Sequence, residues 1–253
     1  MANIRLTYCF KDLKFCEIFL GKMETVEAIN MFKSNSKSDS IVAIIPAHNE
    51  DTRIGHVLDV LKQVSLIDRI VVVDDGSIDE TAKVAKEHGA EVIALEINSG
   101  KASAMDEGVK GTSEPIILFV DADLQNLKPK LINDLIHPVL NGDVEMTMGV
   151  FRKGRFRTDI AHFISPGLSG QRVIKRHVWS LLDKSRPMES IGYGIEEELQ
   201  ALVKEGKTSL RIVHWVGVSQ FTKEEKMGPQ RGLILRMRMY HDIIKTWTRR
   251  HTT

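Results

Sequence analysis

Short runs rich in Ile and Val alternate with amphipathic segments through the middle of this chain. The runs predict strands at residues 41–45, 69–73, 91–95 and 116–120. The amphipathic segments predict helices at residues 54–64, 80–88 and 101–110, because their apolar residues recur at helical spacing. This alternation restricts the chain to an α/β fold, a mostly parallel sheet sandwiched by helices in a single domain.

The composition places few limits on partners. The chain has 253 residues, of which 42% are hydrophobic, enough for a sizeable core. Its 35 basic and 34 acidic residues give a net charge of +1, and we predict no nucleic-acid partner. Cys9 and Cys16 lack the spacing of a metal site, and no run approaches the roughly 20 apolar residues of a membrane span. We therefore predict a cytoplasmic protein.

Polar clusters follow the predicted strands at the points where the strands end. They lie at residues 46–50, 74–81 and 121–123. Because an open parallel sheet binds ligands beyond the carboxyl ends of its strands, these clusters predict a site at that edge. Asp121 and Asp123, one residue apart, offer the oxygen ligands that suit Mg²⁺ or Mn²⁺ bridging to a phosphate. The alternative for this D-x-D pair is an acidic turn that ends a strand.

A turn with the sequence Asn-Ser-Gly-Lys, residues 98–101, precedes a predicted helix. Helix N-terminal amides and an ammonium both favour a phosphate, although an ordinary loop with an exposed lysine has the same pattern. P-loop spacing and a G-x-G-x-x-G are absent from the sequence, which disfavours a dinucleotide fold. Residues 77–80 match a capping box, so we expect them to start the next helix while Asp74 and Asp75 face the ligand.

In this order and spacing, the motifs resemble those of family-2 glycosyltransferases with the GT-A (Rossmann-like) fold. The matching segments are I-I-P-A-H-N-E at 44–50, V-D-D-G-S-I-D-E-T at 73–81, G-K at 100–101 and D-A-D at 121–123. The resemblance covers about residues 40–149. It implies a hexosyltransferase that moves a sugar from a nucleotide-sugar donor, UDP-hexose by family frequency, with Mg²⁺ or Mn²⁺ as cofactor.

The resemblance also implies which residues bind the nucleotide sugar. They are Pro46, Ala47, Glu50, Asp75, Gly100, Lys101, Asp121, Ala122, Gly170 and Gln171. Of these, the first three are expected to line the nucleoside pocket and Asp75 to contact the base. Lys101 is expected near the base or diphosphate, with Arg172 or Lys226 as further positive charge. The metal is expected on Asp121 and Asp123, with Asp123 the more direct ligand.

The second half of the domain is expected to recognise the acceptor. L-S-G-Q-R at 168–172, followed by a helix, and G-Y-G-I-E at 192–196 are similar to two kinds of family member. These are glucosyl-3-phosphoglycerate synthase-like and polyprenyl-phosphate-sugar synthase-like proteins, and residues 154–159 fit the same pattern.

Glu196 and Asp123 are the predicted catalytic residues. By analogy with the acid of the family's Y-G-x-E, Glu196 would take the proton of the acceptor hydroxyl in an inverting enzyme, or only position the acceptor in a retaining one. The alternative is that residues 196–198, all Glu, form an acidic first turn that favours the helix dipole.

Relatives often supply a third metal ligand, commonly a histidine, from the second half. His214 and His241 are the candidates here, and Gln220 stands where such a ligand was sought. A histidine without a ligand role is the expectation for each, with water or nothing as the third ligand. His48 is likewise expected to be solvated.

Three segments are predicted. Residues 1–39 are an extension and linker, and 40–222 are the glycosyltransferase domain, with a nucleotide-sugar half at 40–149 and an acceptor half at 150–222. Residues 223–253 form a basic amphipathic segment. Its helix either lies peripherally on an anionic membrane near a lipid-linked acceptor or packs its apolar stripe on the core. A small-molecule acceptor and a homodimer also stay open.

Two other functions are weighed against glycosyl transfer. A nucleotidyltransferase shares the alternating sheet and paired acids, but it usually has a Gly-rich basic loop after the first strand, which residues 46–51 lack. An inactive glycosyltransferase-like protein would bind a nucleotide sugar without turning it over.

Overall fold

A computed structural model of the chain describes residues 39–152, 170–183, 187, 188, 191, 194–221, 225 and 237. These residues belong to one compact unit, Ser38–Thr253. Several predictions fall outside the described residues. They concern residues 1–38, the 154–159 motif, Lys226, His241 and nearly all of the basic segment at 223–253.

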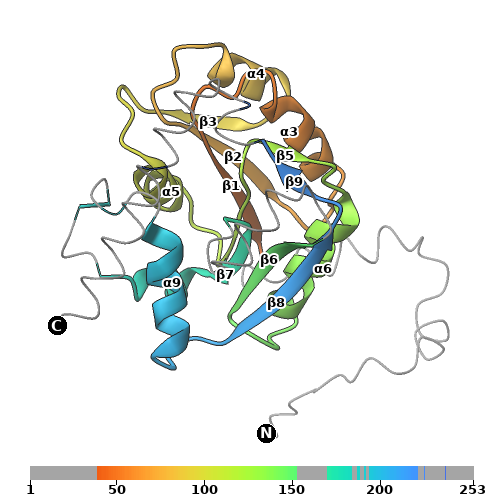
Figure 1. The fold of residues 1–253 in the computed structure, drawn as a ribbon, viewed down its shortest axis with the longest axis vertical. Helices are drawn as coiled ribbons and strands as arrows, with labels where there is room; N and C mark the ends of the chain where they lie inside the picture. Colours follow the sequence, from red (N-terminus) through yellow and green to blue (C-terminus); the bar gives the residue numbers. More distant parts are fainter. Residues whose placement is uncertain are drawn as a thin grey trace, which may run out of the picture. The chain divides into compact units, whose positions relative to one another are not determined.

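A seven-stranded sheet forms the centre of the fold, in the order β3-β2-β1-β4-β7-β6-β8 (Figure 1). Its strands are β1 (Ile41–Ala47), β2 (Arg69–Asp74), β3 (Glu91–Ala94), β4 (Ile116–Phe119), β6 (Met146–Arg152), β7 (Arg172–Lys175) and β8 (Leu210–Val216). Only β7 is antiparallel to its neighbours in this sheet of described residues, and the other pairings are parallel. The predicted mostly parallel α/β fold is confirmed, and each of the four predicted strands is present.

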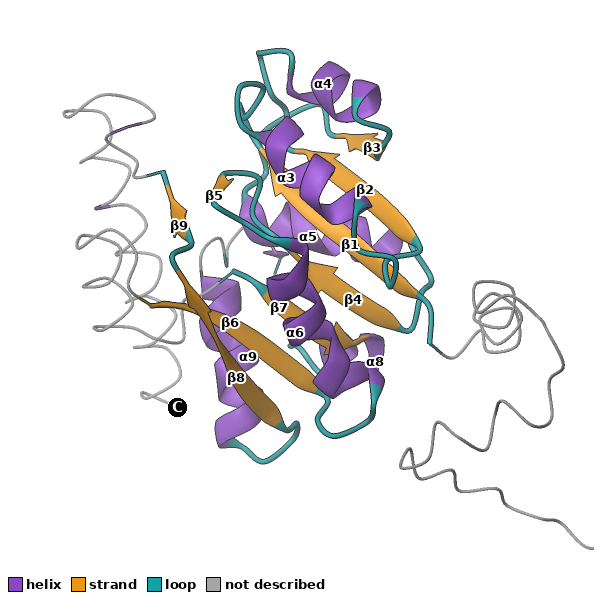
Figure 2. Cartoon of the chain, turned by 90° about the vertical axis from the view of Figure 1, so that its right-hand side faces the viewer, coloured by secondary structure: helices purple, strands orange, loops and turns teal. Residues whose placement is uncertain are grey.

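Helices cover both faces of the sheet, as Figure 2 shows. One face carries α3 (Ile54–Lys62), α4 (Thr81–Glu87) and α6 (Pro129–Leu140), and the other α5 (Lys101–Lys110), α8 (Arg176–Ser180) and α9 (Ile195–Lys204). Successive side chains of a strand point to opposite faces. Accordingly, Ile41, Ala43 and Ile45 of β1 join one buried cluster, and Val42 and Ile44 join the other. Burial on both sides explains why these strands are continuously apolar.

A strand, not a helix, follows the L-S-G-Q-R motif directly. The prediction was a helix after residue 172, but β7 occupies residues 172–175 and α8 begins at Arg176. The register pairs Phe119 with Arg172, so β7 extends the sheet next to β4. This pairing brings the motif to the strand that ends just before Asp121.

A second, two-stranded sheet joins the two halves of the domain. β5 (Leu124–Gln125) pairs antiparallel with β9 (Ser219–Gln220), and Leu124 lies opposite Gln220. Ser219 Oγ donates a hydrogen bond of 2.9 Å to Gln125 Oε1. The chain segment around Gln220 is therefore held beside the residues that directly follow Asp123.

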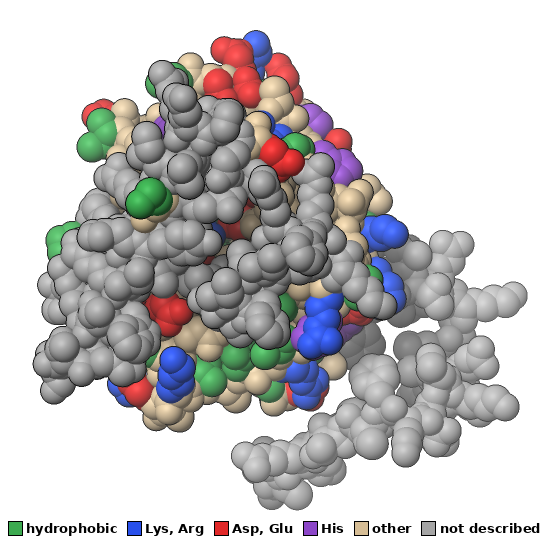
Figure 3. All heavy atoms as spheres, viewed as in Figure 1, with side chains coloured by type: hydrophobic (Ala, Val, Ile, Leu, Met, Phe, Trp, Pro, Cys, Tyr) green, Lys and Arg blue, Asp and Glu red, His purple; other side chains and the backbone are tan. Residues whose placement is uncertain are grey.

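The surface carries charges of both signs. On the face drawn in Figure 3, acidic side chains gather at the end near α4, and basic side chains lie on the side of α6. Among the described residues, no helix is both long and apolar enough to cross a bilayer.

Candidate functional site

Asp75, just past β2, fixes the loop that leads into α5. Its backbone N–H donates to Ala47 O at 2.8 Å, which joins the ends of β1 and β2. Its carboxylate accepts hydrogen bonds from the amides of Ser99 (2.7 Å) and Gly100 (2.8 Å). Gly100 has a φ of +91°, a conformation that glycine adopts without steric cost. Asp75 thus fixes the turn from which α5 begins at Lys101, the predicted helix start, and the predicted contact of Asp75 with the base stays a prediction.

The loops after β1 and β2 are tied to each other by reciprocal hydrogen bonds. Asn49 N–H donates to Ser77 Oγ at 2.9 Å, and Ile78 N–H donates to Asn49 Oδ1 at 2.9 Å. Asn49 has a φ of +56°, in the left-handed region that asparagine tolerates better than most residues. These two loops behave as one structural unit.

The predicted capping box at residues 77–80 is wrong. Helix α4 has Glu80 at its N-cap with no side-chain capping bond. The Ser77 hydroxyl instead accepts from Asn49, and Thr81 N–H donates to Asp79 Oδ1 at 3.0 Å. The loop that follows the neighbouring strand β1 takes the serine hydroxyl as its hydrogen-bond acceptor. The local sequence motif gives no sign of this tertiary contact.

The nucleoside-pocket residues predicted in the first loop lie beside Asp75. Pro46 and Ala47 end β1, where Ala47 pairs with Asp74. Glu50 is buried, with its amide donating to Thr81 Oγ1 at 2.8 Å and its carboxylate paired with Arg53. The Glu50 carboxylate therefore also has a structural role in holding this loop.

Lys101 is the charged link between the two halves of the site. Its ammonium lies 2.9 Å from Asp121 Oδ1 and 2.8 Å from Glu196 Oε1. The Lys101 and Asp121 side chains are each 17% exposed, and that of Glu196 is 5% exposed. Asp121 follows β4, Lys101 begins α5 and Glu196 lies in the first turn of α9, so three elements converge on one ammonium.

Two amides and a glycine complete this cluster. Gln171 Nε2 donates to Asp121 Oδ2 at 3.0 Å, and Gln220 Nε2 donates to the same oxygen. A Cβ placed on Gly170 would lie 2.5 Å from Lys101 Nζ and 2.7 Å from both Asp121 carboxylate oxygens. Glycine is therefore the residue that fits beside this ion pair. The structure brings the predicted residues Lys101, Asp121, Gly170, Gln171 and Glu196 together.

The charge state of Lys101 follows from its neighbours. Burial lowers the pKa of Lys101, but the carboxylates of Asp121 and Glu196 outweigh burial and hold the pKa above its ordinary value of 10.5. The side chain is a permanent cation at physiological pH.

Arg172, predicted as further positive charge near the phosphates, is a buried residue of β7. It is 1% exposed, with Nη1 3.7 Å from Met146 Sδ. Burial lowers its pKa to about 10, opposed by the charges of Glu196 and Glu197. Arg172 is thus a buried positive charge close to Glu196 and Glu197, and its contribution of positive charge around the phosphates stays a prediction.

Glu196 also lies in an acidic helix turn, as its alternative interpretation predicted, and its catalytic role stays a prediction. Glu196, Glu197 and Glu198 form the first turn of α9, where the helix dipole favours negative charge. Glu196 is nevertheless buried, and its Oε2 has no hydrogen-bond partner among the described residues. Gln171 Oε1 is in the same condition. A buried acceptor without a donor is costly, so these atoms suit a ligand that brings hydroxyl groups.

The D-x-D pair fits a hard divalent cation. Asp121 and Asp123 supply carboxylate oxygens at the carboxyl end of β4, and buried Ala122 separates them. Within the described ranges no group of three or more His, Cys, Asp or Glu side chains could hold a metal. Two carboxylates suffice for Mg²⁺, which commonly keeps waters and phosphate oxygens as its other ligands.

No histidine in the described part of the chain forms a metal site with Asp121 and Asp123. His214 is exposed on β8, and His241 lies outside the described residues. His48 Nδ1 is 2.8 Å from the carbonyl oxygen of Asp75, so this ring packs within the loops instead of being simply solvated. Gln220 stands at the position expected for a histidine, and it donates to Asp121 instead, a contact that the sequence did not predict. A lone glutamine gives no sequence signal for such a contact.

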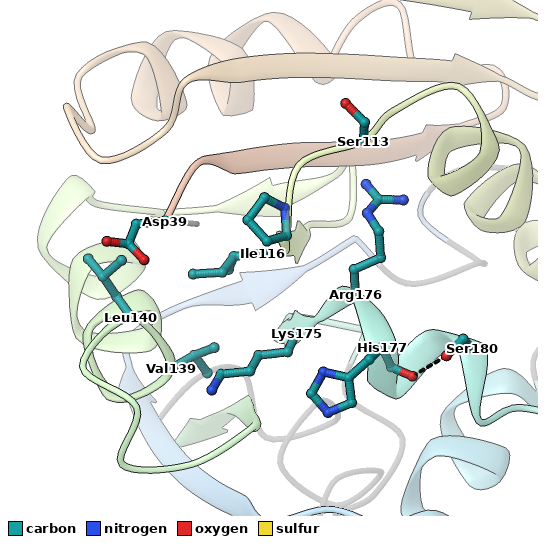
Figure 4. Close-up of a pocket in the computed structure, with 10 residues that line it drawn as sticks. Asp39, Ser113, Ile116, Val139, Leu140, Lys175, Arg176, His177 and Ser180 are labelled. Atoms are coloured by element: carbon teal, nitrogen blue, oxygen red, sulfur yellow. Dashed lines mark hydrogen bonds between the residues drawn. The ribbon is translucent and has the colours of Figure 1, made fainter. Parts of the chain in front are cut away.

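A hollow of about 580 Å³ lies at the opposite edge of the sheet (Figure 4). It is lined by Asp39, Ser113, Pro115, Ile116, Val139, Leu140, Lys175, Arg176, His177 and Ser180. Its polar groups do not converge, because the Arg176 side chain points toward Ser113 and the His177 ring points the other way. Arg176 donates to the carbonyls of Glu114 and Val109. The predicted site residues lie at the carboxyl ends of the strands, and none of them lines this hollow.

The chain belongs to glycosyl transferase family 2, whose sequence profile matches residues 42–189. A segment of 108 residues is 38% identical to 4,4'-diaponeurosporenoate glycosyltransferase of Staphylococcus aureus, covering 41% of this chain and 29% of that protein. Another, of 130 residues, is 35% identical to an uncharacterized protein of Methanocaldococcus jannaschii, covering 50% of this chain and 53% of that one. The chain thus spans about half, or less, of these relatives.

Solved structures of glucosyl-3-phosphoglycerate synthase from Mycobacterium tuberculosis share the fold. Its complex with Mn²⁺, uridine diphosphate and glucosyl-3-phosphoglycerate has a TM-score of 0.67 at 25% identity, over 90% of this chain and 84% of that one. The complex with Mn²⁺, UDP-glucose and phosphoglyceric acid has a TM-score of 0.68 at 24% identity, over 92% and 86%. The predicted family and GT-A fold are confirmed.

Proposed function

We propose that this protein transfers a hexose from a nucleotide sugar, with UDP-hexose as the donor, to an acceptor hydroxyl in a metal-dependent reaction. The observation that carries the proposal is the shared ammonium of Lys101. It joins Asp121, a donor-side carboxylate in a family-2 glycosyltransferase, to Glu196, a carboxylate from the second half. A transferase needs donor and acceptor groups at one point, and the convergence of these two carboxylates on Lys101 supports such an arrangement.

The donor side is assigned to residues 40–149. Pro46, Ala47 and Glu50 form one wall of the nucleoside pocket and the Asp75 region the other, with the amides at the start of α5 near the diphosphate. Support comes from the hydrogen bonds that tie the Asp75 carboxylate to Ser99 and Gly100, which fix this wall before a ligand binds.

The chemistry divides between the two halves. A divalent ion held by Asp121 and Asp123 would neutralise the negative charge that develops on the nucleoside diphosphate leaving group. Lys101 adds a positive charge at the same place. The hydroxyl of the acceptor substrate donates a hydrogen bond to Glu196 Oε2. If the sugar is transferred with inversion, Glu196 takes the proton of this hydroxyl.

The acceptor class is assigned by what relatives use. A solved structure of the synthase contains phosphoglyceric acid, a small acceptor, and the staphylococcal relative is named for a carotenoid acid, a lipid-like acceptor. We propose a small-molecule or lipid-linked hydroxyl acceptor, bound on the side of Gly170, Gln171 and Glu196.

Release of the nucleoside diphosphate tests the proposal. The full-length protein would be incubated with UDP- and GDP-hexoses and with panels of phosphorylated and lipid-linked acceptors, in Mn²⁺, Mg²⁺ or EDTA. We expect metal-dependent release from one donor, abolished in Asp123→Ala and retained in Asp134→Ala, an exposed α6 residue paired with Lys130. NMR of the product would define the anomer. The proposal fails if no donor is consumed or bound under any condition.

The same assay separates the alternatives. An inactive protein would be stabilised against heat by a nucleotide sugar but would release nothing with any acceptor. A nucleotidyltransferase would release pyrophosphate from a nucleoside triphosphate and leave nucleotide sugars intact. Membership of the glycosyltransferase family favours the first proposal over both.

A further inference from the structure

The Asp121 carboxylate has different partners on its two oxygens. Oδ2 accepts hydrogen bonds from the neutral amides of Gln171 and Gln220, which orient the group without adding charge. Oδ1 lies 2.9 Å from the Lys101 ammonium. The positive charge therefore sits on an oxygen of a predicted metal ligand.

Little space surrounds this ammonium. Gly170 approaches so closely that even a methyl group there would lie 2.5 Å from Lys101 Nζ. Glu196 Oε1 lies on another side at 2.8 Å. A divalent ion that bound Asp121 through Oδ1 would meet a fixed positive charge within a few ångströms in a partly buried site, where charges interact strongly.

We propose that Lys101 is a built-in countercation that competes with the divalent metal for Asp121, so that metal binds tightly only together with the nucleotide diphosphate. The inference rests on the proposed function, because it takes Asp121 as a metal ligand. It assigns to Lys101 control over the order of binding, in addition to its contact with the leaving group.

The charge balance explains the order. Without a diphosphate, Lys101 already neutralises part of the charge of Asp121 and Glu196. An added divalent ion therefore gains less attraction from these carboxylates and is repelled by the Lys101 ammonium. A bound diphosphate brings negative charge that satisfies both the metal and Lys101. By linkage, a nucleotide that relieves this repulsion strengthens metal binding, and the metal strengthens nucleotide binding by the same factor.

The test measures Mn²⁺ binding alone, by electron paramagnetic resonance of the free ion, on the full-length protein. We expect Lys101→Met to bind Mn²⁺ about tenfold or more tightly than the wild type, within the usual range of coupling between sites. The factor by which UDP strengthens Mn²⁺ binding should fall by a similar amount. A purely structural role for Lys101 predicts weaker binding, not tighter.

A lysine on the same helix provides a matched control. Lys110 also contacts two carboxylates, Asp106 at 2.9 Å and Glu107 at 2.7 Å, but it lies at the far end of α5 and is exposed. Lys110→Met removes the same charge, and we expect it to leave the Mn²⁺ affinity unchanged. Lys101→Gln, whose amide can still donate to a carboxylate, replaces Lys101→Met if the latter does not fold.

Asp121→Asn separates failure of this inference from failure of the proposed function. If Asp121→Asn abolishes Mn²⁺ binding but Lys101→Met binds Mn²⁺ no more tightly than the wild type, Lys101 does not compete with the metal. The same conclusion follows if neither the wild type nor Lys101→Met binds Mn²⁺ in the absence of a nucleotide. Equal binding by wild type and Asp121→Asn would instead mean that the metal site itself is misassigned.

Discussion

The two halves of the site are held in place by different kinds of contact. In the first half, backbone groups anchor the polar side chains, as when the amides of Ser99 and Gly100 hold the Asp75 carboxylate. In the second half, the contacts to Lys101 and Asp121 come from side chains, from Gln171 and Gln220 to Asp121 and from Glu196 to Lys101, while backbone pairing holds the segments that carry the two glutamines.

This difference indicates a division of labour. Backbone anchors keep one geometry, because moving them would disrupt the loop and the start of a helix together. Side-chain contacts can be exchanged for ligand contacts at low cost, since only rotamers change. We infer that the first half is pre-organised for the nucleotide and that the second half rearranges its contacts as ligands arrive.

Removing the charge of Asp121, where the halves meet, should have the largest effect. We expect Asp121→Asn to lower the turnover rate by about 10³-fold, the upper range for removing one electrostatic contact in an active site. The unfolding free energy should also fall, by about 1 to 3 kcal/mol, because asparagine cannot offset the Lys101 charge and still accept from both glutamine amides. Steady-state kinetics and urea unfolding would measure both, with Asp134→Asn on α6 as the control. Near-normal turnover by Asp121→Asn would remove Asp121 from the reaction.

Gly170→Ala tests whether the second half depends on side-chain geometry. The new methyl would displace Lys101 or Asp121, both flexible at the contact. We expect turnover to fall by about 10²-fold, the effect of a misplacement near 1 Å, with an almost unchanged melting temperature. Kinetics and calorimetry on the same preparation would show this split. A large loss of stability would mean that the second half is as rigid as the first.

Gly76→Ala is the corresponding change in the first half. Gly76 has a φ of +65°, and a Cβ there would lie 2.6 Å from backbone atoms of Ile97 and Asn98. Left-handed backbone and a backbone clash cannot be relieved by a rotamer change, so we expect a loss of about 2 to 3 kcal/mol of unfolding free energy. Urea denaturation would measure it. If Gly76→Ala and Gly170→Ala were equally stable, the first half would be no more rigid than the second.

Glu114, near the start of β4 and away from the predicted site, should give the smallest combined effect on turnover and stability when it is changed. Burial raises the pKa of Glu114, but a hydrogen bond from Arg69 and hydrogen bonds from the backbone amides of Ser113 and Glu114 outweigh it and hold the pKa below its ordinary value of 4.5. A depressed carboxyl pKa stabilises the fold above the unfolded pKa, and this stabilisation is lost as pH falls through the folded pKa.

We therefore expect Glu114→Gln to cost about 1 kcal/mol of unfolding free energy at neutral pH and progressively less below pH 4.5, with unchanged turnover. Unfolding curves at several pH values would measure the difference. Curves that stay parallel down to acid pH would contradict the pairing with Arg69.

The first half could be predicted from sequence almost element by element. β1, β2 and β4 are compact apolar runs that are buried on both faces, and β3 is an edge strand with half-buried Val92 and Ile93 at its centre. Each intervening helix buries apolar residues, so local pattern and tertiary burial agree. The edge where Asp75, Lys101 and Asp121 gather followed from the parallel topology alone.

The second half resisted prediction for physical reasons. β5 and β9 have two residues each, too short for any periodic signal. Gln220 meets Asp121 only because that short ladder forms, and their separation in sequence gives no local cue. Ser77 failed as a cap because a tertiary partner, Asn49, takes its hydroxyl.

The reciprocal bonds between Asn49 and the loop at Ser77 and Ile78 also bear on redesign and on evolutionary drift. Neither loop can be replaced alone without stranding donors and acceptors of the other. A change of sugar-nucleotide preference by loop grafting should therefore exchange both loops as a matched cassette, taken from one parent.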